Sequence, residues 1–275
     1  MKKCDLHIHS NFSDSDADLE SIFQQAQEKG LACIAITDHD TVDGVARARV
    51  YSKTYNVELV EALELSAEHN NLEVHILAYF INSDDRRLKS ELAHIRDLRR
   101  ERLIWMGEKL NSLGIKVNTQ ELFLSIKGAV PTRLHLALYL LKKGKIKTLA
   151  QAFNKYLSPG RPAYRARFKY SVKEAIQLIK SFGGLSVLAH PHMISEQSWV
   201  EEFITSGIDG LETIYPNMTE TLNSRYKNLA DKFGLLQSGG SDAHGSYKQF
   251  VNIGKVSVPY DWVEEMKRRC GRGRC

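Results

Sequence analysis

The chain has 275 residues, of which 43% are hydrophobic and 26% are charged, and its formal net charge is +5. This balance is that of an ordinary globular protein, and a chain of this length can bury a core without disulfides or a structural metal. No apolar run is long enough to cross a bilayer and no apolar segment follows Lys2 and Lys3, so we expect neither a membrane span nor a secretion signal.

The four cysteines form no CxxC pair. Cys4 and Cys33 lie in apolar, strand-like runs, which predicts buried thiols. For Cys270 and Cys275 in the basic tail we expect free thiols, with metal binding or oxidation as alternatives. We therefore predict a cytoplasmic protein in a reducing compartment. The sequence indicates no obligate protein partner, and we expect a monomer.

The first part of the chain alternates short apolar runs with amphipathic stretches. Strands are predicted at residues 4–8, 31–36, 58–60 and 74–80, and helices at residues 18–29 and 42–53. Such alternation is typical of a parallel sheet, either open or closed into a barrel.

The middle of the chain, from 86 to 164, has little strand pattern. A helical stripe of apolar residues begins at Leu88 and ends at Gly114, Thr132 opens a second helix, and residues 149–157 suggest a third. We predict a helical insertion, or cap subdomain, over one end of the sheet.

The strand–helix alternation then resumes. Ser171 and Glu174 form a capping box that opens a helix. Strands are predicted at residues 185–189, 208–214 and 235–237, and helices at residues 199–205 and 220–233. Residues 1–85 and 165–275 are therefore expected to form one α/β domain around the sheet.

Histidines with acidic neighbours stand at or near the ends of these predicted strands. The candidates are His7 and His9, Asp14, His39, Glu64, His75, His190, and Asp242 with His244. Residues i and i+2 of a strand point the same way, so His7 and His9 can hold one ion together. The carboxyl ends of successive parallel strands converge on one mouth. Imidazole and carboxylate groups together suit Mn²⁺, Fe²⁺ or Zn²⁺, which predicts a catalytic metal site.

Several of these motifs together resemble the PHP (polymerase and histidinol phosphatase) family. The segments are DLHIHSNFSD (5–14), ITDHD (36–40), LELS (63–66), the strand around His75, AHPH (189–192) and GSDAH (240–244). The resemblance covers nearly the whole chain and implies a distorted seven-stranded (β/α) barrel with three metal ions, for which we expect Mn²⁺, with Fe²⁺ or Zn²⁺ as alternatives.

The resemblance also implies a ligand set, matched motif by motif. The first ion takes His7, His9, Glu64 and Asp242; the second takes Glu64, His75 and His190; the third takes Asp14, His39 and His244. Some relatives carry His where this chain has Asp14, which keeps a ligand and adds negative charge. We predict that Asp14, His39, Glu64, His190, Asp242 and His244 are the residues on which catalysis depends.

Two segments of the middle region, PTRLHLA (131–137) and KYLSPGRPAY (155–164), resemble the insertion of a particular subgroup. That subgroup contains 3′,5′-nucleoside bisphosphate phosphatases and a 5′-to-3′ exonuclease on short RNA. The resemblance implies a metal-dependent phosphoesterase that removes the 3′-phosphate of nucleoside 3′,5′-bisphosphates, with short RNA as a further substrate.

We expect the insertion to supply the substrate's second phosphate with a cation. Arg133 is the first candidate, because a guanidinium grips phosphate with two donors, and Arg161 and Lys155 follow it. A salt bridge on an exposed helix face is an equal alternative for Arg133. His135, two residues along the helix, is expected to point elsewhere unless the segment is irregular.

Two other functions remain open at this point. One is a histidinol-phosphate-type phosphatase or another small-molecule phosphomonoesterase. The other is a non-catalytic nucleotide- or RNA-binding module. The loss of metal ligands would favour this reading, but every motif position here holds a residue that can bind a metal ion.

Overall fold

The computed structural model describes residues 2–165, 170–247 and 252–271. Within them, eight strands form one sheet in the order β7-β6-β5-β4-β3-β2-β1-β8. Their bounds are β1 Lys3–Ile8, β2 Leu31–Ile36, β3 Glu58–His69, β4 Leu72–Tyr79, β5 Leu185–Leu188, β6 Gly210–Ile214, β7 Leu236–Gly239 and β8 Val258–Pro259. The chain after β7 meets the end of β1, where Ile8 and Ala243 form a parallel bridge. The expected seven-stranded barrel is confirmed, and β8 is a short extra strand beside β1.

Strand β4 corrects the prediction of a parallel sheet, because it runs antiparallel to both β3 and β5. The reason is a tight hairpin. Asn70 and Asn71, between β3 and β4, both have positive φ, at 49° and 62°. Asparagine tolerates this conformation, and a two-residue turn of this kind joins antiparallel strands. Strand β3 is also much longer than the predicted 58–60, and β8 runs antiparallel to β1.

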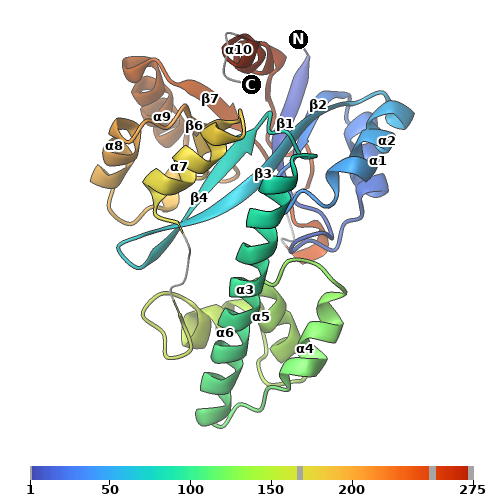
Figure 1. Cartoon of the computed structure of the whole chain (residues 1–275), viewed down its shortest axis with the longest axis vertical. Coiled ribbons are helices and arrows are strands. Elements are labelled where there is room, and N and C mark those ends of the chain that lie inside the picture. Colours follow the sequence, from blue (N-terminus) through green and yellow to red (C-terminus); the bar gives the residue numbers. More distant parts are fainter. Residues whose placement is uncertain (1, 166–169, 248–251, 272–275) are drawn as a thin grey trace.

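Helices cover the outside of the barrel on two sides (Figure 1). On one side α1 Leu19–Glu28 and α2 Val45–Tyr55 pack over β1 and β2. On the other side lie α7 Val172–Ser181, α8 Ser198–Thr205 and α9 Glu220–Phe233. As the sequence predicts, α7 begins with a capping box between Ser171 and Glu174.

A further helix, α10 Tyr260–Gly271, closes the end of the barrel near the chain termini (Figure 1). Its Val263 and Met266 join the apolar interior formed by the inward-facing residues of the strands. The sequence reading missed both α10 and β8.

The cysteine expectations hold in part. Cys4 and Cys33 are buried free thiols, as predicted. Cys270 is disulfide-bonded, so the expectation of a free thiol is wrong at this position. Cys275 lies outside the described residues.

Between β4 and β5 the described chain forms only helices. These are α3 Arg86–Ser112, α4 Thr119–Ile126, α5 Arg133–Lys142, α6 Leu149–Ala152 and the π-helical turn η1 Phe153–Leu157. They surround a core of their own, from Leu103 to Ala163. This insertion lies beyond the end of the barrel opposite the two termini, and α3 runs from the barrel into it (Figure 1). The sequence did not predict α4, and the domain boundaries at 86 and 164 stay a prediction.

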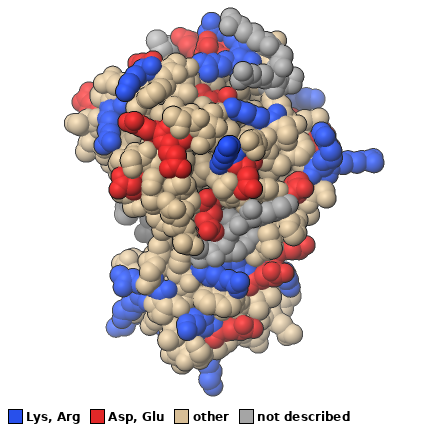
Figure 2. All heavy atoms as spheres, turned by 60° about the vertical axis from the view of Figure 1, so that its left-hand side comes forward, with Lys and Arg blue, Asp and Glu red and all other residues tan. Residues whose placement is uncertain are grey.

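The face turned forward in Figure 2 shows Lys and Arg side chains along the part of the insertion nearest the barrel. No helix of the described ranges combines the length and apolar character that crossing a membrane requires.

Gly240, which follows β7, permits the close approach of β7 and β1. A Cβ atom at this position would collide with the backbone nitrogen and Cβ of His7 and lie 2.8 Å from Asp5 Oδ1. We expect Gly240→Ala to lower the free energy of unfolding by about 1–3 kcal/mol, because the two segments must separate. Urea denaturation of metal-free protein measures this. Gly271→Ala is the control, since nothing lies within 4 Å of its added Cβ. Equal stability of the two variants would show that the approach is not tight.

Candidate metal centre

The structure brings all nine predicted metal-binding side chains to the barrel end that faces the insertion. They come from β1 and the loop after it (His7, His9, Asp14), from beyond β2 (His39), from β3 and β4 (Glu64, His75), and from beyond β5 and β7 (His190, Asp242, His244). Seven are buried, and the side chains of His75 and His190 are only 17% and 16% exposed. His190 and Asp242 have positive φ, at 31° and 49°. Backbone strain of this kind at buried non-glycine residues is typical of functional sites.

Glu64 stands at the middle of the site, because its two carboxylate oxygens face imidazoles on different strands. Oε1 lies 2.9 Å from His75 Nδ1 and 3.2 Å from His190 Nε2. Oε2 lies 3.2 Å from His7 Nε2 and 3.1 Å from His9 Nε2. Each oxygen of Glu64 lies beside a different pair of imidazoles, so this carboxylate would help to hold a divalent ion together with either pair.

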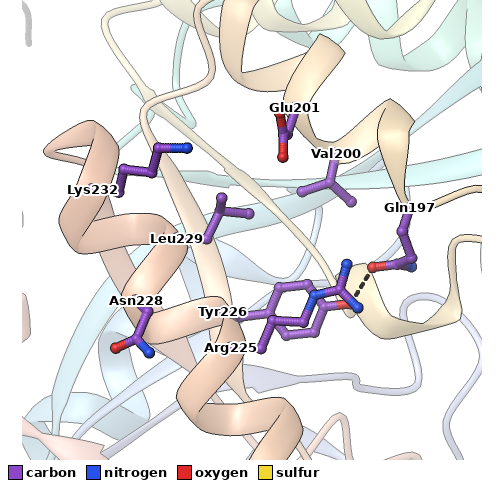
Figure 3. A pocket seen from close by; sticks show the side chains of 8 residues that line it. All are labelled: Gln197, Val200, Glu201, Arg225, Tyr226, Asn228, Leu229 and Lys232. Atoms are coloured by element: carbon purple, nitrogen blue, oxygen red, sulfur yellow. Dashed lines mark hydrogen bonds between the residues drawn. The ribbon is translucent and has the colours of Figure 1, made fainter.

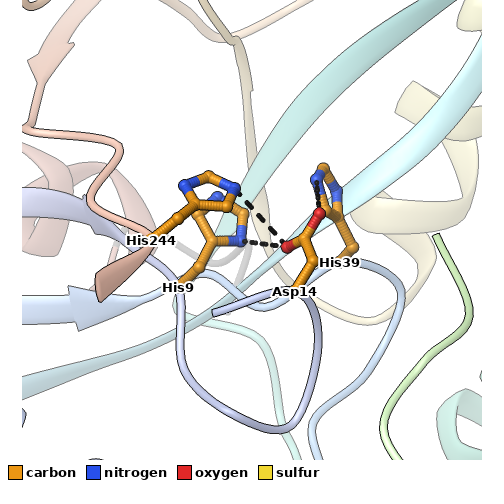
Figure 4. Close-up of side chains that lie close together, drawn as sticks. All are labelled: His9, Asp14, His39 and His244. Atoms are coloured by element: carbon orange, nitrogen blue, oxygen red, sulfur yellow. Dashed lines mark ion pairs between the residues drawn. The ribbon is translucent and has the colours of Figure 1, made fainter. Parts of the chain in front are cut away.

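Among the described residues, three groups each offer ligand atoms within 4.8 Å of one another. They are His7, His9, Glu64 and Asp242; His9, Asp14, His39 and His244; and His39, Glu64 and His75. Figure 4 shows the second group, in which three imidazoles surround the Asp14 carboxylate. This group includes His9, which the motif matching gave to another ion. His190 Nε2 lies 3.3 Å from His75 Nδ1, so it adjoins the third group.

Buried polar atoms that make ion pairs but no hydrogen bond in these groups fit a bound cation. Within the described part of the chain, His9 Nδ1, Asp14 Oδ1 and His39 Nδ1 are buried and have no hydrogen-bond partner. Buried polar atoms are nearly always paired, and an unpaired cluster calls for an explanation such as an ion. Nitrogen and oxygen donors without thiolate suit a catalytic divalent metal.

Protons balance the charge of the site when no cation is bound. Burial alone lowers the pKa of His9, but hydrogen bonds to Asp242 and Glu64 outweigh it and raise this pKa to about 9. Burial raises the pKa of Glu64, yet the nearby His39 and His75 hold it well below its usual value. A divalent ion would take over the role of these protons.

A second layer of side chains orients the site. Glu212 on β6 lies 3.0 Å from His7 Nδ1 and accepts a hydrogen bond from the His190 backbone at 2.6 Å. The Tyr215 hydroxyl donates to Asp242 Oδ2 at 2.5 Å. Sequence reasoning missed Glu212 and Tyr215. The position of Glu212 within a strand that leads to the mouth was the available signal.

The two acidic neighbours of His39 hold loops rather than joining the three groups. Asp38 accepts hydrogen bonds from Ser10 and Ser13, which fixes the loop that carries Asp14. Asp40 forms a buried ion pair with Arg99 of α3, with Nε and Oδ2 2.6 Å apart. This ion pair fastens the insertion to the barrel.

Glu73, also missed, connects the insertion to the metal groups. Its Oε1 lies 3.1 Å from His75 Nε2, and its Oε2 accepts from Arg133 at 2.7 Å and from Arg102 at 3.4 Å. Glu73 precedes His75 by two residues on the same face of β4, and this spacing could have indicated it. Metal-binding histidines usually give their second nitrogen to such a carboxylate.

The predicted substrate-binding residues divide into two pairs. Arg133 lines a pocket of about 360 Å³ together with His75 and His190. His135 lies at the third position of α5, where its Nδ1 is 3.0 Å from Thr132 Oγ1 in a capping box, and burial lowers its pKa. Lys155 and Arg161 are exposed, and neither lines this pocket as far as the described residues define it.

A separate hollow of about 290 Å³ lies between α8 and α9 (Figure 3). It is lined by Arg225, Lys232 and Glu201 among others, and it contains no member of the three groups. The chemistry therefore belongs to the mouth of the barrel.

Comparison with known proteins agrees with this geometry. The model of the PHP domain matches residues 5–161. A 5′-3′ exoribonuclease of Haemophilus influenzae is 30% identical over 88% of this chain and 90% of its own length. A 3′,5′-nucleoside bisphosphate phosphatase of Chromobacterium violaceum is 29% identical over 89% of this chain and 88% of its own.

Among solved structures, a Bifidobacterium adolescentis protein classed with the metal-dependent phosphoesterases superposes with a TM-score of 0.87. It is 28% identical, and the match covers 97% of this chain and 96% of that one. The buried histidine–carboxylate mouth, the closed barrel and these matches lead to one conclusion: the chain belongs to the PHP family and is a metal-dependent phosphoesterase.

Proposed function

We propose that this enzyme hydrolyses the 3′-phosphate ester of nucleoside 3′,5′-bisphosphates and also acts on the 5′ end of short RNA. The observation that supports the proposal is one pocket whose lining includes both candidate metal ligands and a cation of the insertion. His75, His190 and Arg133 all line it, and Glu73 lies between the guanidinium of Arg133 and the imidazole of His75. The activities of the Haemophilus and Chromobacterium relatives support the same substrate class.

The three side-chain groups would hold three divalent ions, for which we propose Mn²⁺, with Fe²⁺ or Zn²⁺ as alternatives. Bound there, such ions lower the pKa of water and neutralise phosphoryl oxygens. The protein's own part is to fix the ligands. Glu64 and Asp242 supply charge, Glu212 holds His7 in one orientation, and Glu73 does the same for His75.

Arg133 is proposed to bind the phosphate that does not react. Its guanidinium donates hydrogen bonds to Glu73 and to the Leu157 carbonyl, at 2.7 and 3.4 Å. The side chain is 21% exposed and lines the pocket. A guanidinium has five N–H donors, so donors remain for a phosphate. The Glu73 ion pair also pre-orients the group, which reduces the entropy lost on binding.

The alternative of a non-catalytic binding module does not hold for a metal-dependent phosphoesterase. A histidinol-phosphate-type phosphatase would need one phosphate site only. The second phosphate site at Arg133 favours a bisphosphate or an oligonucleotide end over such a monophosphate.

Asp242→Asn tests the metal groups. We expect this variant to lose roughly 10³-fold in phosphate release from adenosine 3′,5′-bisphosphate, because metal ions contribute several kcal/mol of charge stabilisation. The assay uses metal-stripped protein refilled with Mn²⁺. Asp261→Asn, at an exposed acid of α10, is the matched control and should keep full activity. Wild-type rates in Asp242→Asn would place the chemistry elsewhere.

Arg133→Lys tests the second phosphate site. It keeps the charge beside Glu73 but loses the paired donors. We expect KM for adenosine 3′,5′-bisphosphate to rise about 10- to 100-fold, the value of a charge-assisted hydrogen bond, while turnover of adenosine 3′-monophosphate changes little. Arg161→Lys should change neither. An equal effect of Arg133→Lys on both substrates, or equal wild-type rates on both, would contradict a second phosphate site.

A further inference from the structure

The pocket that holds Arg133 has one wall that phosphate chemistry does not explain. Part of its lining is apolar, with Leu72 and Val74 from β4 and Met193, Ile194 and Trp199 from the segment after β5. This wall adjoins His190 and therefore continues directly from the metal groups.

The wall is a built feature rather than a loose loop. After the strained backbone of His190, a single 3-10 turn, Pro191–Met193, leads the chain out of the barrel. The Gln197 side-chain amide donates to the carbonyls of Pro191 and Ile194, at 3.1 and 2.7 Å. The oxygen of the same amide accepts from the Tyr226 hydroxyl at 2.6 Å, a bond drawn in Figure 3. Helix α9 thus braces the turn that carries the wall.

The most exposed member of the wall is Met193, whose side chain is 60% exposed. Together with its apolar neighbours in the lining it forms an apolar patch of the kind that marks ligand-binding grooves, and methionine adapts its shape to what it contacts. Trp199 lies partly buried behind it, held edge-on by His69 at 4.7 Å between ring centroids. One part of the wall can therefore adjust while another is fixed.

We infer that this wall is a nucleobase subsite, in which the base packs by its faces against Met193, Ile194 and Trp199. The inference rests on the proposed function and specifies its substrate. A nucleotide has phosphate charge at the sugar and an aromatic ring beyond it. The lining of the pocket combines candidate metal ligands and Arg133 with the apolar wall. Its volume of about 360 Å³ is within the usual range for small-ligand sites.

The chemistry of the wall also predicts what it does not select. Leu72, Val74 and Ile194 have no polar side-chain atoms, and methionine sulfur is a weak acceptor only. The Trp199 indole N–H can only donate, and the Ser195 hydroxyl, which also lines the pocket, can donate or accept, so it suits the edge of any base. Contacts to the base faces tolerate any base, because every base has an aromatic face. We therefore expect adenosine, guanosine, cytidine and uridine 3′,5′-bisphosphates to have KM values within about fivefold of one another. This spread is well below the total gain in affinity from stacking a base, which is about 10- to 100-fold.

The test removes the base rather than exchanging it. The substrates are 2′-deoxyadenosine 3′,5′-bisphosphate and its abasic counterpart, 1,2-dideoxyribose 3,5-bisphosphate, which keep both phosphates in place. We expect kcat/KM of the Mn²⁺-loaded wild type to fall about 10- to 100-fold on the abasic compound. Equal values would overturn the subsite.

Variants then assign the loss to the wall. Met193→Ala should lower kcat/KM several-fold on the nucleotide and leave the abasic compound unchanged. Leu124→Ala, at an exposed residue of α4 outside the pocket, is the matched control and should affect neither. An equal loss on both substrates would mean that Met193 acts on the metal groups through the His190 turn, and would contradict a base contact. Trp199→Ala should repeat the Met193 pattern more strongly where the protein remains folded.

A binding measurement separates this inference from the proposed function. Adenosine 5′-monophosphate and ribose 5-phosphate are titrated into metal-free enzyme by calorimetry. Tighter binding of the nucleotide that Met193→Ala removes would support the subsite even in an enzyme that releases no phosphate from bisphosphates. Equal affinity for both, in an enzyme that does hydrolyse bisphosphates, would refute the subsite and leave the proposed function intact.

Discussion

The Glu64 carboxylate is the constraint around which the barrel is arranged. It is 1% exposed, and imidazoles from β1, β4 and the loops after β2 and β5 lie within 3.5 Å of its two oxygens. A buried carboxylate needs compensating charge, and here protonated histidines or metal ions must provide it. The strands can bring these groups together because the carboxyl ends of β1, β2, β5 and β7 and the first half of the antiparallel β4 lie at the same mouth. The close contact at Gly240 brings the chain after β7 against β1 and so places Asp242 beside His7.

The insertion is fastened to that mouth by charge rather than by apolar packing alone. Arg99 of α3 pairs with Asp40 at the end of β2, and Arg133 of α5 pairs with Glu73 on β4. Glu73 in turn contacts His75, so one carboxylate joins the cation of the insertion to a candidate metal ligand. A substrate phosphate that binds Arg133 would thus be linked to His75 through Glu73 alone. This arrangement lets a helix of the insertion contribute a cation to the site.

Much of the site could be predicted because its signals are local. The His7–His9 spacing, the acidic neighbours of His39 and the Asp242–His244 pair each stand within a few residues, and the fold and family they indicate are confirmed. The roles of individual ligands and the domain boundaries stay predictions. Glu73 and Glu212 were not predicted as site residues because their partners are distant in sequence. Glu73 pairs with Arg133, and Glu212 pairs with His7. The direction of β4 was not predicted, because the preceding strand was expected to end at residue 60 and the Asn70-Asn71 turn was therefore not placed in a hairpin.

Counting bound metal ions tests the central claim most directly. Metal-stripped protein is dialysed against Mn²⁺ and the ions per chain are measured by atomic emission, for the wild type and for Glu64→Gln. Since Glu64 belongs to two of the three groups, the account predicts three ions in the wild type and the loss of two of them in the variant. A Glu64→Gln protein that retains as many ions as the wild type would show that the carboxylate at the centre of the barrel does not hold the metals.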